Sequence, residues 1–292
     1  MKRPRLLACG ELLWDLLPEG QTLGGAPVNF ACHAALQGAQ ATILSAVGED
    51  PHGEQALNIL IRFGLNTSLV QRHADTATGT AKVILNSAGL PGFEITANTA
   101  WDYIEYGVEL DARLGDIDAI YFGTLGQRGS LSRATIRRVV GLAHERGLCR
   151  VLDVNLRRPF YDDRLIRESV ALASVLKLSD EELPEVARAC GVVVKPDPSE
   201  TLRNLRERFG LQMVILTRGS LGALLVSSNE TIDQPGIPCI VRDTVGAGDS
   251  FTAAVAVGFL RGEPLATVLR KACETASVVC SHVGAVPAPP RG

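Results

Sequence analysis

Short apolar runs alternate with longer amphipathic stretches through the middle and the C-terminal part of the chain. A short apolar run bounded by turn residues is typical of a buried strand, whereas apolar residues at helical spacing are typical of a helix that covers a sheet. Strand–helix–strand alternation predicts an α/β fold with a central, mostly parallel sheet and helices on both faces. The predicted strands lie at residues 6–9, 42–47, 117–122, 150–154, 174–178, 213–217 and 223–226.

Helical patterns lie between these runs, and several begin with Ser, Asp or Pro. They cover residues 27–37, 52–63, 132–147, 162–171, 179–190, 198–209, 247–260 and 264–282. Two stretches, 11–23 and 78–101, instead carry turn residues and alternating apolar and polar positions. We interpret them as antiparallel strands that stand off the main sheet. The sequence therefore predicts a single domain over 1–292 whose lid comprises about 11–24 and 76–102.

Composition excludes several classes of protein. The 292 residues carry a formal net charge of −3, so a basic footprint for nucleic acid is absent. No apolar run approaches the roughly 18 residues of a membrane span. Only three apolar residues precede Cys9, too few for a secretory signal. The seven cysteines are scattered and never form Cys-x-x-Cys, which argues against disulfides or zinc and predicts a cytoplasmic protein.

Gly246-Ala247-Gly248-Asp249 connects an extended segment to the apolar run 251–260. A glycine-rich turn that opens a helix points free backbone N–H groups at one spot, and the helix dipole adds positive charge there. Such an anion hole suits a phosphoryl group in transfer, and the Asp249 carboxylate at its mouth suits a proton acceptor. The structural alternative is an ordinary helix N-cap.

Residues 24–31, Gly-Gly-Ala-Pro-Val-Asn-Phe-Ala, form a second cluster. Paired glycines allow a tight turn, and Pro27 suits the first turn of a helix. The Asn29 amide near that helix start both donates and accepts hydrogen bonds, as recognition of sugar hydroxyls requires. A plain loop-to-helix junction is the alternative.

The string Asp243-Thr244-x-Gly246-Ala247-Gly248-Asp249-Ser250-Phe251 resembles the C-terminal signature of the PfkB carbohydrate kinases, which have the ribokinase-like fold. Residues 24–31 and 48–53 resemble the N-terminal signature of the same family. The resemblance implies transfer of phosphate from ATP, with Mg²⁺, to a sugar hydroxyl. It implies that Asp249 takes the proton and that the backbone N–H groups of Gly246, Ala247 and Gly248 hold the charge.

The resemblance also implies the binding residues. The acceptor sugar would contact Asp15, Gly24, Gly25, Asn29 and Arg157, the last within an Asp153-x-Asn155-x-Arg157 pattern similar to fructokinases and 2-keto-3-deoxygluconate kinases. The nucleotide side would use Lys177, Glu182, Thr217, Gly219 and Gly222. Ser179-x-x-Glu182 stands where many members have Asn-x-x-Glu, and a capping box is its structural alternative. Many members also bind a monovalent cation such as K⁺, here expected at Asp243, Thr244 and Gly284.

Fructose is the expected acceptor, because Gly10-Glu11-x-Leu13-x-Asp15 together with residues 24–29 is most similar to fructokinases. The alternatives are 2-keto-3-deoxygluconate kinase, ribokinase and nucleoside kinase. A non-catalytic sugar sensor on the same fold is a further alternative, against which the retention of Asp249 argues. The apolar face of a lid sheet predicts a homodimer that pairs two lids.

Overall fold

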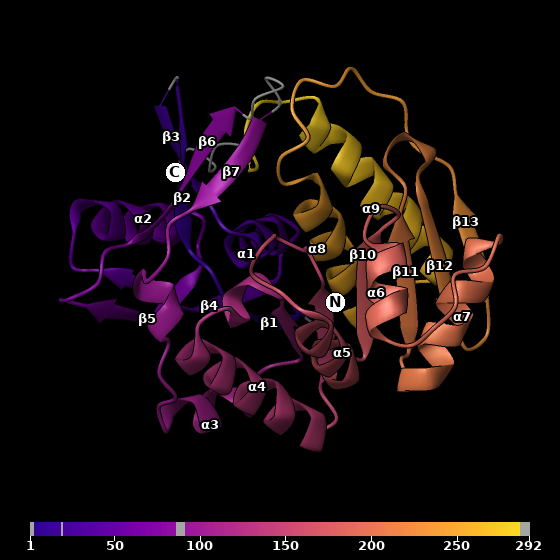
Figure 1. Ribbon diagram of the computed structural model, residues 1–292, viewed down its shortest axis with the longest axis horizontal. Helices are drawn as coiled ribbons and strands as arrows, with labels where there is room; N and C mark the ends of the chain where they lie inside the picture. The colour runs from indigo at the N-terminus through magenta and orange to yellow at the C-terminus, as the bar shows by residue number, and fades with distance from the viewer. Residues whose placement is uncertain (1–2, 19, 86–90, 287–292) are drawn as a thin grey trace.

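The computed structural model describes residues 3–18, 20–85 and 91–286. A nine-stranded sheet forms its centre, in the order β13-β12-β11-β10-β9-β8-β1-β4-β5 (Figure 1). Every pairing is parallel except β11–β12 and β12–β13, which are antiparallel. The strands are β1 (Arg5–Cys9), β4 (Gln40–Gly48), β5 (Asn66–His73), β8 (Ala119–Phe122), β9 (Cys149–Asp153), β10 (Val175–Ser179), β11 (Met213–Thr217), β12 (Ala223–Ser227) and β13 (Thr231–Gln234).

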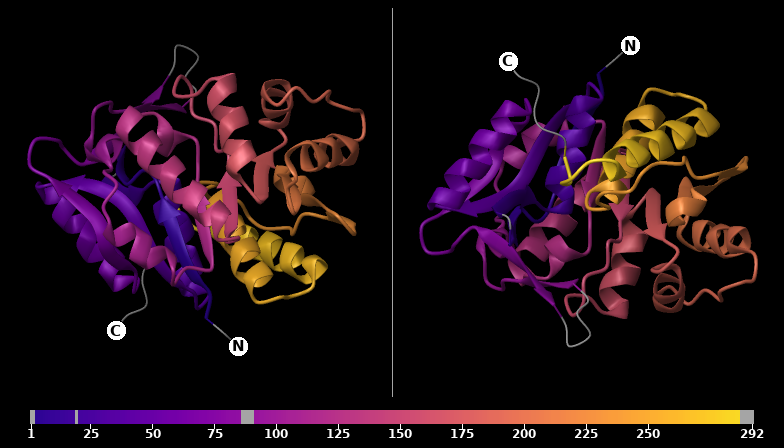
Figure 2. Two further views of the ribbon diagram at one scale, coloured as in Figure 1. Left: turned by 90° about the horizontal axis from the view of Figure 1, so that it is seen from below. Right: turned by 90° about the horizontal axis from the view of Figure 1, so that it is seen from above.

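Helices cover both faces of this sheet, as predicted. Side chains alternate along β1, so that Leu6 and Ala8 join one buried core while Leu7 and Cys9 join the other. The first core is closed by α1 (Ala26–Leu36), α2 (Pro51–Arg62), α8 (Ala247–Leu260) and α9 (Leu265–Cys280). The second is closed by α3 (Glu109–Leu114), α4 (Ser130–Glu145), α5 (Asp163–Leu172), α6 (Leu183–Ala189) and α7 (Pro198–Phe209). In Figure 2 the yellow α8 and α9 accordingly lie on the opposite side from the pink and salmon α4 to α7.

A separate four-stranded sheet stands above the main one at the upper left of Figure 1. Its order is β3-β2-β6-β7, from β2 (Leu13–Leu17), β3 (Gly20–Gly24), β6 (Gly79–Leu85) and β7 (Pro91–Ile95). The two hairpins are antiparallel as predicted, but β2 and β6 pair in parallel, so the purely antiparallel prediction was wrong. Both β2 and β6 follow the carboxyl ends of strands in the main sheet and leave it in the same direction. Residues 86–90 of the predicted lid lie outside the described residues.

The structure differs from the prediction at one helix start and contains three elements that the apolar pattern of the sequence did not predict. The helix predicted at 179–190 begins only at Leu183, because Ser179 still pairs with Thr217 in the sheet. Strands β5 and β13 and helix α3 were not predicted. Both strands lie at the edges of the sheet, where only one side is paired and polar side chains are tolerated.

Buried contacts attach the small sheet to the main body. Trp14 of β2 is buried, and its Nε1 donates to the His52 carbonyl of α2 at 3.1 Å. The Asp50 carboxylate at the start of α2 accepts from the backbone N–H and the hydroxyl of Thr78, at 2.7 and 2.8 Å. Among the helices of the described residues, none is long and apolar enough to cross a membrane. The seven cysteines are all free thiols.

Candidate active site

The candidate residues meet at the carboxyl ends of β1, β9 and β10, beside the starts of α1 and α8. Strands β9 and β10 are parallel neighbours, and only β8 lies between β9 and β1. The carboxyl ends of all three strands therefore lie along one edge of the sheet. Helices α1 and α8 pack against each other on one face of the sheet, in the centre of Figure 1. Crevices at the carboxyl ends of parallel strands are where open α/β sheets bind ligands.

The start of α8 is open to an anion. Gly246 is its N-cap at φ 78°, and no side chain of the described residues caps this end. A Cβ on Gly246 would lie 2.4 Å from the Ala285 carbonyl oxygen, so only glycine fits. The Ala247 N–H already donates a long bond of 3.3 Å to the Thr244 carbonyl, whereas for Gly248 and Asp249 the described residues provide no acceptor. Of the three amides predicted to form an anion hole, those of Gly246 and Gly248 thus donate to no acceptor among the described residues.

Asp249 lies in the first turn of α8, where its Oδ2 accepts from Asn29 Nδ2 of α1 at 2.9 Å. Burial raises the pKa of its carboxyl, while the Asn29 hydrogen bond and the positive charges of Lys177 and Arg157 oppose that rise. A carboxylate with a raised pKa and one oxygen held in place is suited to accept a proton near neutral pH.

Gly24 and Gly25, in the turn before α1, are crowded by the residues around them. A Cβ on Gly24 would lie 2.3 Å from Asp15 Oδ2, and one on Gly25, at φ 104°, would lie 2.4 Å from the Glu11 carbonyl oxygen. Any side chain here would displace the carboxylate or the turn. The two glycines thus let Asp15 approach the helix start that carries Asn29.

Asp15 and Arg157 face the same space from different elements. Burial raises the pKa of Asp15 to about 6, an effect that the charge of Arg157 opposes and that of Asp249 reinforces. Arg157 is exposed, and its Nη1 donates only to the carbonyl of Leu156 at 3.2 Å among the described residues. The structure therefore brings the predicted acceptor residues together and leaves the guanidinium available to a ligand.

A buried ion pair lies beside the first turn of α8. Lys177 Nζ of β10 is 3.1 Å from Asp153 of β9, and both side chains are almost fully buried. A Cβ on Gly248 would lie 3.1 Å from the same ammonium, so Lys177 abuts the first turn of α8. Thr252 of α8 donates to Asp153 Oδ2 at 3.1 Å, which closes the network. Burial raises the pKa of Asp153 to about 6, against the charge of Lys177.

Both carboxylate oxygens of Glu182 accept hydrogen bonds from backbone N–H groups that follow β9 and end β10. Its Oε1 accepts from the Leu156 N–H at 2.7 Å and its Oε2 from the Ser179 N–H at 2.8 Å. Ser179 Oγ accepts in turn from the Glu182 N–H at 3.3 Å. These reciprocal bonds are those of a capping box, although helix α6 starts only at Leu183. Glu182 thereby also fixes the residue next to Arg157.

The predicted nucleotide loop follows β11 on the same edge. Thr217 pairs in register with Ser179, which places the two strand ends side by side. Gly219 adopts φ 54° and Gly222 φ 89°. A Cβ on Gly222 would lie 2.1 Å from the Gln234 carbonyl oxygen, so this glycine serves packing against the segment after β13. Gly219, with nothing within 4 Å, faces open space.

The predicted cation residues also come together. Asp243 Oδ1 accepts from the Val245 N–H at 3.0 Å, and its Oδ2 accepts from the Gly284 N–H at 2.9 Å. Thr244 is exposed beside them. Asp243 therefore joins the loop before α8 to the C-terminal segment, 41 residues further along the chain.

Comparison with known proteins shows the family of the chain. The family model described as pfkB family carbohydrate kinase matches residues 19–291. The chain belongs to this family. An uncharacterised sugar kinase of Pyrococcus horikoshii is 28% identical over 282 residues, covering 88% of this chain and 83% of the relative. Its crystal structure has a TM-score of 0.82 and covers 96% of this chain and 93% of that one.

Two fructokinases extend the comparison. The fructokinase of Klebsiella pneumoniae is 25% identical, over 87% of this chain and 84% of its own length. A fructokinase with bound ATP from Xylella fastidiosa is 22% identical, with a TM-score of 0.85 over 97% of this chain and 95% of that one, and shows the shared fold. The resemblance inferred from the sequence is confirmed: the protein is a pfkB-family carbohydrate kinase with the ribokinase-like fold.

Two buried polar residues of this pfkB kinase escaped the sequence analysis as site residues. Glu11 is 2% exposed, and its Oε1 accepts from the Ala26 N–H at 3.3 Å. Tyr121 of β8 stacks on Phe30 at 4.1 Å, and its hydroxyl has no hydrogen-bond partner among the described residues. The signal for Tyr121 was a single phenol within an apolar strand. The signal for Glu11 was a carboxylate two residues after the end of another apolar strand, β1.

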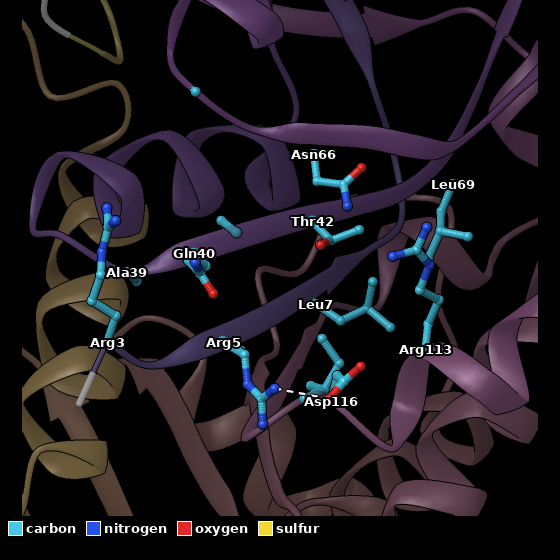
Figure 3. Close-up of a pocket in the computed structure, with 13 residues that line it drawn as sticks. Arg3, Arg5, Leu7, Ala39, Gln40, Thr42, Asn66, Leu69, Arg113 and Asp116 are labelled. Carbon is cyan, nitrogen blue, oxygen red and sulfur yellow. Dashed lines mark hydrogen bonds and ion pairs between the residues drawn. The ribbon is translucent and has the colours of Figure 1, made fainter.

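A hollow of this kinase lies elsewhere. It encloses about 500 Å³ at the amino ends of β1, β4 and β5, around Arg3, Arg5, Thr42, Asn66 and Arg113 (Figure 3). Arg5 Nη1 forms an ion pair with Asp116 at its rim, 2.9 Å apart. No residue of the candidate active site lines this hollow, because that site occupies the opposite edge of the sheet.

Proposed function

We propose that this carbohydrate kinase transfers the γ-phosphoryl group of ATP to a primary hydroxyl of fructose. The observation that carries the proposal is the hydrogen bond from Asn29 to Asp249, 2.9 Å long. It brings the acceptor-side helix α1 to a carboxylate in the first turn of α8, at the mouth of an anion hole. Relatives named fructokinase support the choice of sugar.

In the proposed reaction the acceptor hydroxyl lies against Asp249. The carboxylate takes the hydroxyl proton as the oxygen bonds to the γ-phosphorus, and the bond from that phosphorus to the bridging oxygen of ADP breaks. Negative charge on the phosphoryl oxygens is held by the amides of Gly246, Ala247 and Gly248 and by the positive end of the α8 dipole. Mg²⁺ enters bound to ATP, as part of the substrate.

The residues present fit a phosphate group. Gly246 and Gly248 leave the backbone bare, and the Lys177 ammonium stands beside Gly248. We propose that Lys177, Glu182, Thr217, Gly219 and Gly222 serve the nucleotide side, Glu182 and Gly222 by shaping loops. Asp15, Gly24, Gly25, Asn29 and Arg157 hold the sugar, and the small sheet closes over it as a lid that keeps water away.

Consumption of ATP in the presence of fructose tests the proposal. Asp249→Asn removes the proton acceptor but keeps the shape, so kcat should fall roughly 10²- to 10⁴-fold while the KM for ATP changes little. Asp116→Asn is the matched control, because Asp116 is an exposed carboxylate at the opposite edge, and it should keep full activity. Full activity of Asp249→Asn would show that Asp249 is not the proton acceptor and would contradict the proposed mechanism.

A panel of acceptors tests the sugar. Fructose should give the highest kcat/KM among fructose, 2-keto-3-deoxygluconate, ribose and a nucleoside. A higher value for another acceptor would replace fructose and leave the chemistry intact. Binding of sugar without any turnover would instead favour the non-catalytic sensor.

Two finer expectations stay predictions. We propose a monovalent cation at Asp243, Thr244 and Gly284, which a comparison of activity in K⁺ and in tetramethylammonium would check. We also propose a homodimer that pairs two small sheets, which the molar mass in solution would decide.

A further inference from the structure

Helix α1 contacts the start of α8 and its surroundings twice, one helical turn apart. Asn29 and His33 are four residues apart, so they lie on the same face of the helix. Asn29 donates to Asp249 at 2.9 Å, and the His33 ring nitrogen Nε2 lies 2.8 Å from the Ala285 carbonyl oxygen. Both side chains are buried, 5% and 3% exposed. The first contact belongs to the proposed catalytic site, whereas the second has no role yet.

His33 must donate this hydrogen bond, because a carbonyl oxygen can only accept. The proton therefore resides on Nε2. Burial lowers the pKa of His33, although the bond to Ala285 opposes that effect. The ring thus stays neutral near pH 7 and acts as a fixed donor rather than as a charge.

The residue held by His33 packs against the anion hole. The Ala285 carbonyl oxygen lies 2.4 Å from where a Cβ of Gly246 would stand, so the N-cap of α8 rests on Ala285. Ala285 itself is only 7% exposed. The preceding residue, Gly284, donates to Asp243 Oδ2 at 2.9 Å. Residues 284 and 285 are therefore clamped between α1 on one side and the loop 243–246 on the other.

We propose that His33 is a positioning residue for phosphoryl transfer, which acts through Ala285 on Gly246 and so fixes the first turn of α8. The inference rests on the proposed function of that turn as the anion hole. Asn29 and His33 thus attach α1 to the α8 region at two points, and we call this pair of contacts the brace. Through it, the helix whose Asn29 binds the sugar also fixes the place where the phosphoryl group is held. A misplacement of about 1 Å at such a site costs roughly 100-fold in rate.

His33→Leu and His33→Gln test the brace. Leucine removes the donor, whereas the glutamine amide can place an N–H near the position of Nε2. We expect kcat to fall about 10- to 100-fold in His33→Leu, with the KM for the acceptor nearly unchanged because Asn29 is intact. His33→Gln should recover most of the rate. Cys32→Ala, a buried change on the same helix, is the matched control and should keep the rate.

Hydrogen exchange provides a readout that does not need turnover. Peptides over 243–250 and 281–286 should exchange faster in His33→Leu than in the wild type and in His33→Gln, while peptides of α4 stay unchanged. Unaltered exchange in these two segments would overturn the brace, whatever the activity. Equal loss of rate in the leucine and glutamine variants would overturn it as well. If the wild type turns over no acceptor, the proposed function fails, and the exchange data still decide on the brace.

If His33→Leu does not fold, His33→Asn replaces it, since its shorter amide cannot reach Ala285 as the glutamine amide does. Faster exchange in the asparagine variant alone supports the inference. Equal exchange in both amide variants contradicts it.

Discussion

Glu11 is a carboxyl buried at the floor of the candidate site, and burial raises its pKa to about 7. The folded protein keeps the proton at pH values where the unfolded chain, with an ordinary pKa near 4.5, has lost it. Ionisation of Glu11 therefore favours unfolding, and its contribution to the free energy of unfolding declines as pH rises from about 4.5 to 7.

Glu11→Gln should abolish this decline, because an amide does not titrate and its oxygen can still accept from Ala26. We expect the free energy of unfolding of the variant, relative to wild type, to rise by about 3 kcal/mol between pH 4 and pH 8. Urea unfolding across that range measures it. Glu105→Gln, a change of the same type at an exposed position, is the control. A constant difference between Glu11→Gln and wild type would contradict the assigned burial effect.

Sequence predicted those site residues whose role follows from local backbone chemistry. Gly246, Gly248 and Asp249 predict a helix start that suits an anion, and Gly24 and Gly25 predict a tight turn. Both patterns are local, so neither depends on contacts with distant parts of the chain. His33 could not be recognised in this way, because its partner Ala285 is 252 residues away. Tyr121 gave a signal only as a polar group within a buried strand, and Glu11 only as one that follows a buried strand.

At the scale of elements, one carboxylate joins α2 to β6. Asp50 caps α2 by accepting from the Gly53 N–H at 2.8 Å, and it also accepts from the N–H and the hydroxyl of Thr78, just before β6. Although burial alone would raise the pKa of Asp50, these hydrogen bonds lower it. Its contribution to stability is thus present above about pH 4 and is lost as pH falls through the lowered pKa.

Asp50→Asn should lower the free energy of unfolding by about 1–3 kcal/mol at pH 7, because the amide NH₂ group would face a donor where the carboxylate has an oxygen. The loss should shrink as pH falls through the lowered pKa of Asp50, because the wild-type carboxyl then takes up a proton itself. Asp162→Asn is the control, since Asp162 caps α5 through a single bond from the Leu165 N–H and Asn is an equally good cap. Equal effects of the two substitutions would show that the bonds to Thr78 contribute nothing.

The main elements were predicted where burial makes the pattern simple. Central strands are buried on both faces and appear as continuous apolar runs, so seven of them could be located, six parallel strands and the antiparallel β12. The edge strand β5 mixes polar and apolar residues, and its existence depends on pairing with β4. The parallel pairing of β2 with β6 depends on how two distant hairpins leave the main sheet, which no local pattern records.

For the whole molecule we propose that the main sheet and the small sheet form one domain over 1–292. Both tryptophans of the chain lie at the junction of the two sheets. Trp14 of β2 bonds to α2, as described above. The Trp101 ring lies against Gly79 of β6, and the Arg128 guanidinium carbon lies over the ring, 3.9 Å from its centroid. Arg128 also forms a buried ion pair with Asp102 at 2.8 Å.

Since these contacts cross the junction and are buried, the small sheet should not separate before the main body unfolds. Tryptophan fluorescence reports the junction, while far-UV circular dichroism reports mainly the helices of the main body. In urea the two transitions should have the same midpoint and the same slope, as a two-state unit requires. Trp101→Phe, which leaves Trp14 as the sole reporter, should also give coincident curves at a lower midpoint. A fluorescence transition at lower urea than the loss of helix would show that the small sheet is a separate unit, joined to the kinase body but not folding with it.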